Sequence, residues 1–227
     1  MVWTPIVVFN LVWGQFDNSS SKDDRIMTVS FDINSTDLSP KCIYSDDAVN
    51  MTAGSAEWDD FFGHYPVLVK NGIEVVRLDP SDYSKDIQGN SVDIESGNSG
   101  DVMIAFPRRG LRISRSGSII SISFTTKTND NTYQYYAHTH NKDLEKFYVG
   151  AYNGFFDDNG RLRSLSGKIP TNSKSLPACR EAAQLNGNSY EQFAFYQLVY
   201  LQAMFIAKYK NLDGQSSIGN GKAIVFG

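Results

Sequence analysis

The sequence predicts an α+β fold, with a mainly antiparallel sheet and two helices near the carboxy terminus. Short segments of alternating or apolar residues recur through the first two-thirds of the chain, separated by turn residues. Only two helical patterns occur, both after residue 174, and strands do not alternate with helices. The 227 residues suffice for one large core, so we expect one main domain.

The strands are predicted from residue alternation and turn chemistry. In residues 26–33, Met27, Val29, Phe31 and Ile33 alternate with more polar neighbours, which indicates a strand with one face in the core and one wet face. Asn71-Gly72 separates two apolar segments, and this pair favours the type I′ turn of a two-residue hairpin. Further strands are expected at residues 102–106, 111–114, 118–126 and 147–152.

The two expected helices differ in character. The first covers residues 175–186, with Ser175 as N-cap, Pro177 in the first turn and Gly187 as the residue that ends it. The second covers residues 191–211 and is apolar on nearly every side. We therefore expect the second helix to be enclosed almost all round.

Residues 1–24 are expected to form a strand and a linker that make an assembly contact, ahead of a compact domain at residues 25–227. The apolar segment 2–13 lacks the basic region and cleavage site of a secretion signal. It is also shorter than the roughly 20 residues that cross a bilayer. A detached apolar strand and a fully apolar helix both need a cover, so we expect a homo-oligomer.

The charge balance argues against a nucleic-acid partner. The chain has 21 basic and 25 acidic residues, a net charge of -4. Its densest basic run is Arg108-Arg109 followed by Arg112 and Arg115, which we interpret as the solvated face of a strand pair. The carboxy-terminal helix is interrupted by polar residues, so membrane insertion is not expected either.

No catalytic, metal or cofactor site is predicted, and we expect the chain not to be an enzyme. Cys42 and Cys179 match no metal or redox spacing, which leaves two buried thiols or a disulfide between them. His138 and His140 could share one face of a strand, but no further metal ligand is visible nearby. Adjacent carboxylates point to opposite faces of a strand and cannot flank a sugar as a glycosidase requires, which applies to residues 46–47, 59–60 and 157–158.

Aromatic residues gather in loops and at strand ends, and core packing explains most of them. Some could form platforms on which the C–H face of a sugar stacks, because an aromatic ring has an apolar face and a wet edge. We take Trp58, Tyr135 and Tyr152 as the candidate ligand-binding residues.

Eight short strings, in their order along the chain, resemble a family of tailed-phage and prophage minor structural proteins. They lie at residues 44–48 (YSDDA), 78–86 (LDPSDYSKD), 100–107 (GDVMIAFP), 137–138 (AH), 147–154 (FYVGAYNG), 162–167 (LRSLSG), 190–193 (YEQF) and 211–221 (NLDGQSSIGNG). This family consists of tail-fibre or tail-tip proteins related to the C-type lectin-like domains of receptor-binding variable proteins.

The resemblance implies a C-type lectin-like fold and a place in the phage tail of the virion, after assembly in the bacterial cytoplasm. It implies other tail proteins and a host-surface receptor or glycan as partners. Family members commonly continue past the loop at residues 211–221 into a segment rich in Gly, Asn and Trp. This chain ends at Gly227, which leaves open whether the lectin-like fold is complete here.

The expected function is that of a virion structural protein of the tail tip or fibre, involved in host-surface attachment. One alternative is a lectin-like module that itself binds a glycan through the three aromatic residues. A second is a tail enzyme that degrades polysaccharide with Asp59 or Asp157 acting together with His138. A third is a purely architectural role in the capsid or baseplate.

Overall fold

The computed structural model describes residues 10–13, 24–37, 42–139 and 144–219. Main-chain contacts divide the chain into two units, each assembled from three separate segments. The first unit takes Met1–Ser19, Phe62–Arg108 and Tyr136–Phe195, and the second takes Ser20–Phe61, Arg109–Tyr135 and Tyr196–Gly227. This division differs from the predicted boundary at residue 24, because strand pairing joins segments that lie far apart in the sequence.

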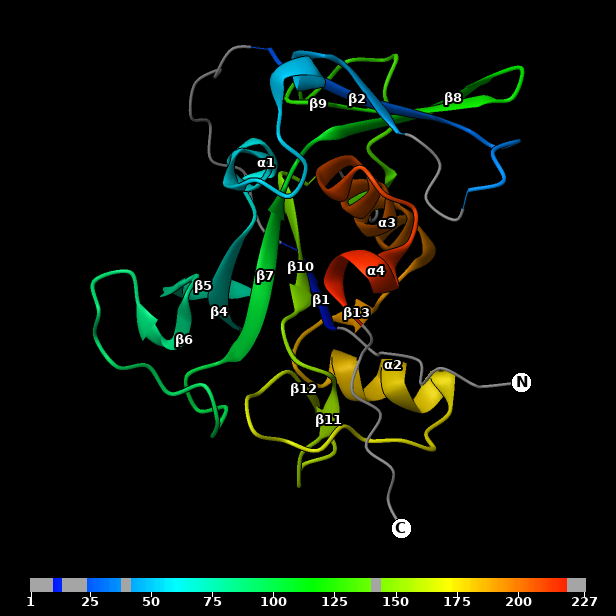
Figure 1. Ribbon diagram of the computed structural model, residues 1–227. Helices are drawn as coiled ribbons and strands as arrows, with labels where there is room; N and C mark the ends of the chain where they lie inside the picture. The colour runs from blue at the N-terminus through cyan, green and yellow to red at the C-terminus, as the bar shows by residue number, and fades with distance from the viewer. Residues whose placement is uncertain (1–9, 14–23, 38–41, 140–143, 220–227) are drawn as a thin grey trace. The chain divides into compact units, whose positions relative to one another are not determined.

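The first unit is organised around a seven-stranded antiparallel sheet with the order β13-β1-β10-β7-β4-β5-β6 (Figure 1). Its strands are β1 (Asn10–Trp13), β4 (Tyr65–Lys70), β5 (Ile73–Asp79), β6 (Asp82–Asp86), β7 (Asp101–Pro107), β10 (Lys146–Gly150) and β13 (Glu191–Gln192). The unit also contains the pair β11 (Phe155–Phe156) and β12 (Leu162–Arg163), the 3-10 helix η2 (Tyr136–His138) and the helix α2 (Leu176–Gln184).

The hairpin predicted at Asn71-Gly72 is confirmed. Strands β4 and β5 pair antiparallel, with Lys70 opposite Ile73. Asn71 and Gly72 have φ angles of 52° and 80°, the left-handed conformation that a type I′ turn needs at both central residues. Local chemistry is sufficient here because the turn depends on two adjacent residues.

Strand β1 is paired on both sides, contrary to the expectation of a detached amino-terminal strand. It lies between β10 and β13, with Leu11 opposite Val149 on one side and Glu191 on the other. The first part of the predicted strand, residues 2–9, lies outside the described residues. The described part of this strand therefore gives no argument for an oligomer.

Both faces of the seven-stranded sheet are buried at strand β4. Val67, Leu68 and Val69 of β4 are all fully buried, although successive side chains of a strand point to opposite faces. The core on one face consists of Val67, Val69, Met103, Ala105, Tyr148, Leu162, Ala182, Ala183 and Tyr190. The core on the other face consists of Leu68, Leu78, Ile94 and Val102.

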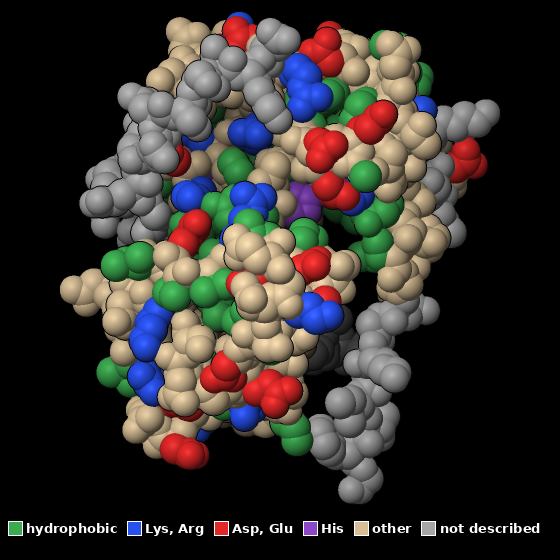
Figure 2. Space-filling model, turned by 90° about the vertical axis from the view of Figure 1, so that its left-hand side faces the viewer, with side chains coloured by type: hydrophobic (Ala, Val, Ile, Leu, Met, Phe, Trp, Pro, Cys, Tyr) green, Lys and Arg blue, Asp and Glu red, His purple; other side chains and the backbone are tan. Residues whose placement is uncertain are grey.

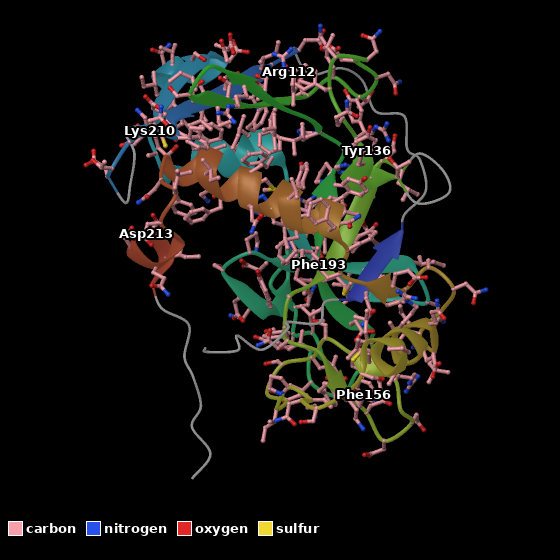
Figure 3. The ribbon with its side chains drawn as sticks, turned by 90° about the vertical axis from the view of Figure 1, so that its right-hand side faces the viewer. Arg112, Tyr136, Phe156, Phe193, Lys210 and Asp213 are labelled. Atoms are coloured by element: carbon pink, nitrogen blue, oxygen red, sulfur yellow. The ribbon has the colours of Figure 1, made fainter. Side chains whose placement is uncertain are left out.

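Helix α2 confirms the predicted cap. The Ser175 hydroxyl oxygen accepts a hydrogen bond from the N–H of Ala178 at 3.4 Å, which satisfies one of the free donors of the first turn. Gly187 follows the helix with φ of 137°, a conformation that favours glycine. Phe156, labelled in Figure 3, packs against the core cluster to which two alanines of α2 belong.

The second unit contains a four-stranded antiparallel sheet with the order β3-β2-β9-β8. Its elements are β2 (Ile26–Asp32), β3 (Ile43–Asp46), η1 (Asp47–Asn50), α1 (Ala56–Phe62), β8 (Gly110–Ser116), β9 (Ile119–Thr125), α3 (Phe195–Tyr209) and α4 (Gly214–Ile218). Phe62 and Phe195, at the ends of two of these helices, are assigned to the first unit.

The two faces of the four-stranded sheet differ in chemistry. One face is apolar: the ring of Phe124 meets that of Tyr200 of α3 edge-on at 5.4 Å, and Val29 is fully buried. The other face carries hydroxyl groups, with Thr28 Oγ1 donating to Ser123 Oγ at 2.8 Å. The predicted alternation is confirmed over β2, since apolar and polar residues take opposite faces. Two details of the prediction were wrong: Ile33 lies beyond the strand and is 44% exposed, and Thr28 on the hydroxyl face is buried.

Helix α3 is shorter than predicted and is not enclosed all round. Residues 191–192 form β13, and the helix covers Phe195–Tyr209. Its buried residues are Gln197, Tyr200, Ala203, Met204 and Ala207, which recur every three to four positions. Phe195 and Tyr196 are 70% and 51% exposed. The expectation was wrong because apolar side chains on every side of a helix do not have to be buried on every side.

The basic run departs from its expected solvated face, whereas the cysteines are the two buried thiols that were one of the two expectations. Arg108 is buried and its Nη1 donates to the carbonyl of Leu144 at 3.2 Å, so only the later arginines of the run are exposed. Cys42 and Cys179 are free buried thiols in different units.

In the described parts of the chain, no helix has both the length and the apolar character needed to cross a bilayer.

Candidate ligand-binding site

Trp58 does not offer a stacking surface. Its side chain is fully buried, at 0% exposure. The indole lies 5.3 Å from the ring of Tyr44 and meets the ring of Phe61 edge-on at 6.3 Å. The interpretation of Trp58 as a sugar platform is therefore corrected to a core residue of the second unit, because no face of the indole reaches solvent.

Tyr152, in the first unit, is half-buried and packs against the core cluster of Leu68 and Leu78. Its backbone N–H donates to Ser164 Oγ at 3.0 Å, which fixes the main chain just after β10. The pKa of the neighbouring Tyr83 is raised by burial and by the proximity of Tyr152, which agrees with a tyrosine pair that lies partly inside the protein. Tyr152 is therefore only partly exposed, and its role in ligand binding stays a prediction.

Tyr135, in the second unit, holds a loop in place. Its hydroxyl oxygen accepts a hydrogen bond from the N–H of Asp130 at 3.0 Å and donates to the carbonyl of Lys127 at 2.8 Å. The loop between residues 127 and 135 is thus closed by a side chain that belongs to the loop itself. Tyr135 therefore positions the loop instead of presenting an open ring.

This loop forms one wall of a shallow hollow with a volume of about 560 Å³. Its lining residues are all of polar type: Asp24, Lys127, Thr128, Asn129, Asp130 and Asn131. The amide groups of Asn129 and Asn131 make no hydrogen bond to any other described residue, and both side chains are exposed. We call this feature the loop hollow.

Asp130 gives the loop its sharp turn. Its Oδ1 accepts hydrogen bonds from the N–H of Thr132 at 2.9 Å and from the hydroxyl of Thr132 at 2.7 Å. These bonds from Thr132 hold the pKa of the Asp130 carboxyl below its usual value. The loop hollow therefore contains an ionised carboxylate at neutral pH.

The loop packs closely on the hydroxyl face of the four-stranded sheet. The guanidinium carbon of Arg112, labelled in Figure 3, lies 4.8 Å from the centre of the Tyr133 ring. At Gly110, an added Cβ would lie 2.8 Å from Tyr133 Cβ and 2.8 Å from Thr125 Cγ2. Only a residue without a side chain allows this approach, so Gly110 helps to seat the loop.

Sequence analysis did not single out residues 129–131 as part of a site. The available signal was the run of five hydrogen-bonding side chains from Lys127 to Asn131. Sequence could not reveal that Asp24 lies opposite this run, with its carboxylate 3.7 Å from Lys127 Nζ. The hollow forms where two segments about a hundred positions apart in the sequence meet. A neighbouring hydrogen bond, from the N–H of Arg25 to Thr126 Oγ1, joins residues 101 positions apart.

A second polar cluster lies on the seven-stranded sheet. Glu74 Oε1 accepts hydrogen bonds from Tyr148 at 2.6 Å, Lys146 at 2.8 Å and Tyr65 at 2.9 Å. Burial acts to raise the pKa of Glu74, but these three donors outweigh it and hold the pKa below its usual value. Burial raises the pKa of both tyrosines. At neutral pH this cluster is a satisfied network without a free base, and we interpret it as a stabilising contact.

The residues proposed for the enzyme alternative do not offer an accessible acid–base pair. His138 is fully buried, with Nε2 3.1 Å from the carbonyl oxygen of Pro107. Asp59 forms an ion pair with Lys208 of the second unit, whereas Asp157 is paired with arginine in the first unit. His140 lies outside the described residues. In the described ranges, no three His, Cys, Asp or Glu side chains gather as a metal site would require.

Comparisons with protein-family models, with curated proteins and with solved structures found no match to this chain.

Proposed function

We propose that the protein is a non-enzymatic component of a tailed-phage virion, at the tail tip or fibre, and that it takes part in host attachment by binding a surface saccharide in the loop hollow. The resemblance of the eight sequence strings supports the virion role and the C-type lectin-like relationship. The observation that carries the binding role is the exposed polar hollow with an internally fixed loop.

The chemistry of the loop hollow suits a saccharide. Sugars present hydroxyl groups that both donate and accept, and the side-chain amides of Asn129 and Asn131 can do the same. The carboxylate of Asp130 adds a strong acceptor. A volume of about 560 Å³ lies within the usual range of small-ligand sites, roughly 300–1,000 Å³. A loop fixed before binding loses less conformational entropy when the ligand arrives.

The test measures binding of fragments of host wall polysaccharide by titration calorimetry or ligand-observed NMR. We expect Asn129→Ala and Asn131→Ala to weaken binding at least about tenfold, because a sugar hydroxyl would lose its hydrogen-bond partner. The matched control is Gln88→Ala, which removes an exposed amide from the first unit and should bind as the wild type.

The saccharide role would be withdrawn if the wild type showed no binding at millimolar fragment, or if both asparagine variants bound as well as the wild type. Tyr135→Phe supplies a second measure, since it removes the hydroxyl that closes the loop but leaves the lining residues in place. We expect this variant to bind more weakly while its thermal stability changes little.

A purely architectural role in the virion is the second candidate. Hydrophobic side chains reach the surface on the face of the molecule drawn in Figure 2. The architectural role is favoured by large apolar side chains that lie exposed on strands and helices. Examples are Ile43, Ile73 and Leu176, which are 65%, 68% and 60% exposed. If the wild type binds no saccharide but associates with itself or with other tail proteins, this role replaces the first.

A further inference from the structure

We propose that the four-stranded sheet of the second unit continues from one copy of the chain into the next, with the outer edge of β8 pairing with the outer edge of β3 of a second copy. This inference concerns self-assembly and does not depend on the loop hollow. The two strands are the edges of the sheet, whose order is β3-β2-β9-β8. Both edges lie within one unit of the fold.

The edge of β8 offers free backbone groups. Leu111 exchanges hydrogen bonds with Gln134 at 2.9 and 2.8 Å, so the N–H and C=O of Leu111 point away from β9. In an antiparallel strand every second residue points the same way, so the groups of Ile113 and Arg115 also point outward. Among the described residues, no strand pairs with them. Side chains from Arg112 to Ser116 are exposed along this edge.

The strand directions favour a repeated copy at this edge. The sheet has four strands and every neighbouring pair is antiparallel, so β3 and β8 run in opposite directions. A second copy in the same orientation therefore brings its β3 antiparallel to the β8 of the first. The hydroxyl and apolar faces of the two sheets also continue into each other, because the strand alternation is kept.

Charge decides which edges meet. The β8 edge carries Arg112 and Arg115, which would repel a second β8 edge. The β3 edge ends at Asp46 and is followed by Asp47. Strand alternation places Asp46 and Arg115 on the same face of the continued sheet. The opposite charges favour a head-to-tail contact, and a head-to-tail contact repeats into a ring or an open array.

Exposed apolar side chains occur at both edges, but on different faces of the sheet. Ile113 on β8 is 51% exposed and lies on the apolar face, with Asp46 and Arg115, whereas Ile43 on β3 is 65% exposed and lies on the hydroxyl face. The contact involves only the four residues of β3, so we expect association to be weak for one contact and to depend strongly on concentration.

The experiment follows the mass of the full chain by sedimentation velocity over roughly 10 µM to 1 mM, where a small interface would associate. We expect the wild type to gain mass with concentration. Ile113→Pro removes one outward N–H without touching the pairing with β9, and it should weaken association at least about tenfold. Ile113→Thr keeps the N–H and a β-branched side chain and should associate as the wild type.

Charge reversal tests the head-to-tail arrangement. Arg115→Glu alone and Asp46→Lys alone should each associate at least about tenfold more weakly, and an equimolar mixture of the two should recover association. Asp46 has a φ of 54°, a left-handed conformation that asparagine adopts more readily than lysine. Asp46→Asn therefore serves as a second variant if Asp46→Lys unfolds. Far-UV circular dichroism melting verifies that each variant is folded.

The proposal is overturned if the wild type stays monomeric throughout, if Ile113→Pro and Ile113→Thr behave alike, or if the mixture of charge variants does not recover. Association that persists in Asp46→Asn and in Asp46→Lys would also overturn it, because β3 would then not be the partner edge. None of these substitutions touches the loop hollow, so saccharide binding can be scored separately.

Discussion

Replacing Trp58 by alanine should lower the free energy of unfolding of the second unit by about 4 kcal/mol, within the range of roughly 3–5 kcal/mol for buried aromatic truncations. Sequence analysis took this residue as a ligand platform, whereas the structure buries it completely. The two interpretations predict different losses. A platform residue would lose binding and keep stability, and a core residue loses stability.

The magnitude follows from the surroundings of the indole. A fully buried tryptophan removes up to about 250 Å² from water, which at about 25 cal/mol per Å² gives an upper value of about 6 kcal/mol. Alanine keeps part of this burial, and denatured chains already bury some apolar surface. The edge-on contact with Phe61 adds about 1 kcal/mol that alanine cannot make. About 4 kcal/mol is therefore a substantial part of a typical total of roughly 5–15 kcal/mol.

The assay is urea unfolding at neutral pH followed by far-UV circular dichroism, since the substitution itself changes tryptophan fluorescence. Trp58→Phe is the matched control: it keeps an aromatic ring in the same site and should lose only about 1–2 kcal/mol. A loss below about 1 kcal/mol for Trp58→Ala would refute the reasoning, because such values belong to surface positions.

Three further predictions rest on single contacts. Asp101→Asn should cost about 3 kcal/mol in urea unfolding, because it leaves the buried guanidinium of Arg163 without the carboxylate that lies 3.0 Å from its Nε; a loss near zero would contradict this. Glu74→Gln should lower the free energy of unfolding at neutral pH. The difference in this free energy from the wild type should shrink as the pH falls below 4.5, the ordinary pKa of glutamate, because a lowered pKa contributes stability only while the carboxylate is ionised. A difference that grows in acid would show that Lys146 is not the partner of Glu74. Gly100→Ala should lower the melting temperature, because the φ of Gly100 is 127° and an added Cβ would lie 2.7 Å from a backbone oxygen of β4. An unchanged melting temperature would show that the backbone here can move away from β4 without loss of stability.

Part of the candidate site could be predicted from the sequence. Tyr135 was singled out as a ligand-binding residue, which stays a prediction, and its role in closing the loop through Asp130 and Lys127 was not foreseen. The sequence signal was a run of polar residues, which also fits an ordinary turn. The partner across the hollow, Asp24, comes from a distant segment, and such contacts leave no local pattern.

Features that depend on neighbouring residues could be predicted from the sequence. The α+β class, the hairpin at Asn71-Gly72 and the cap at Ser175 follow from alternation, turn preference and capping, which act within a few residues. The tertiary structure alone decided that β1 is paired on both sides, that Trp58 is enclosed and that only one stripe of α3 is buried. Those outcomes depend on which distant segments meet. The apolar character of a side chain indicates that it can be buried, but it does not indicate which residues will cover it.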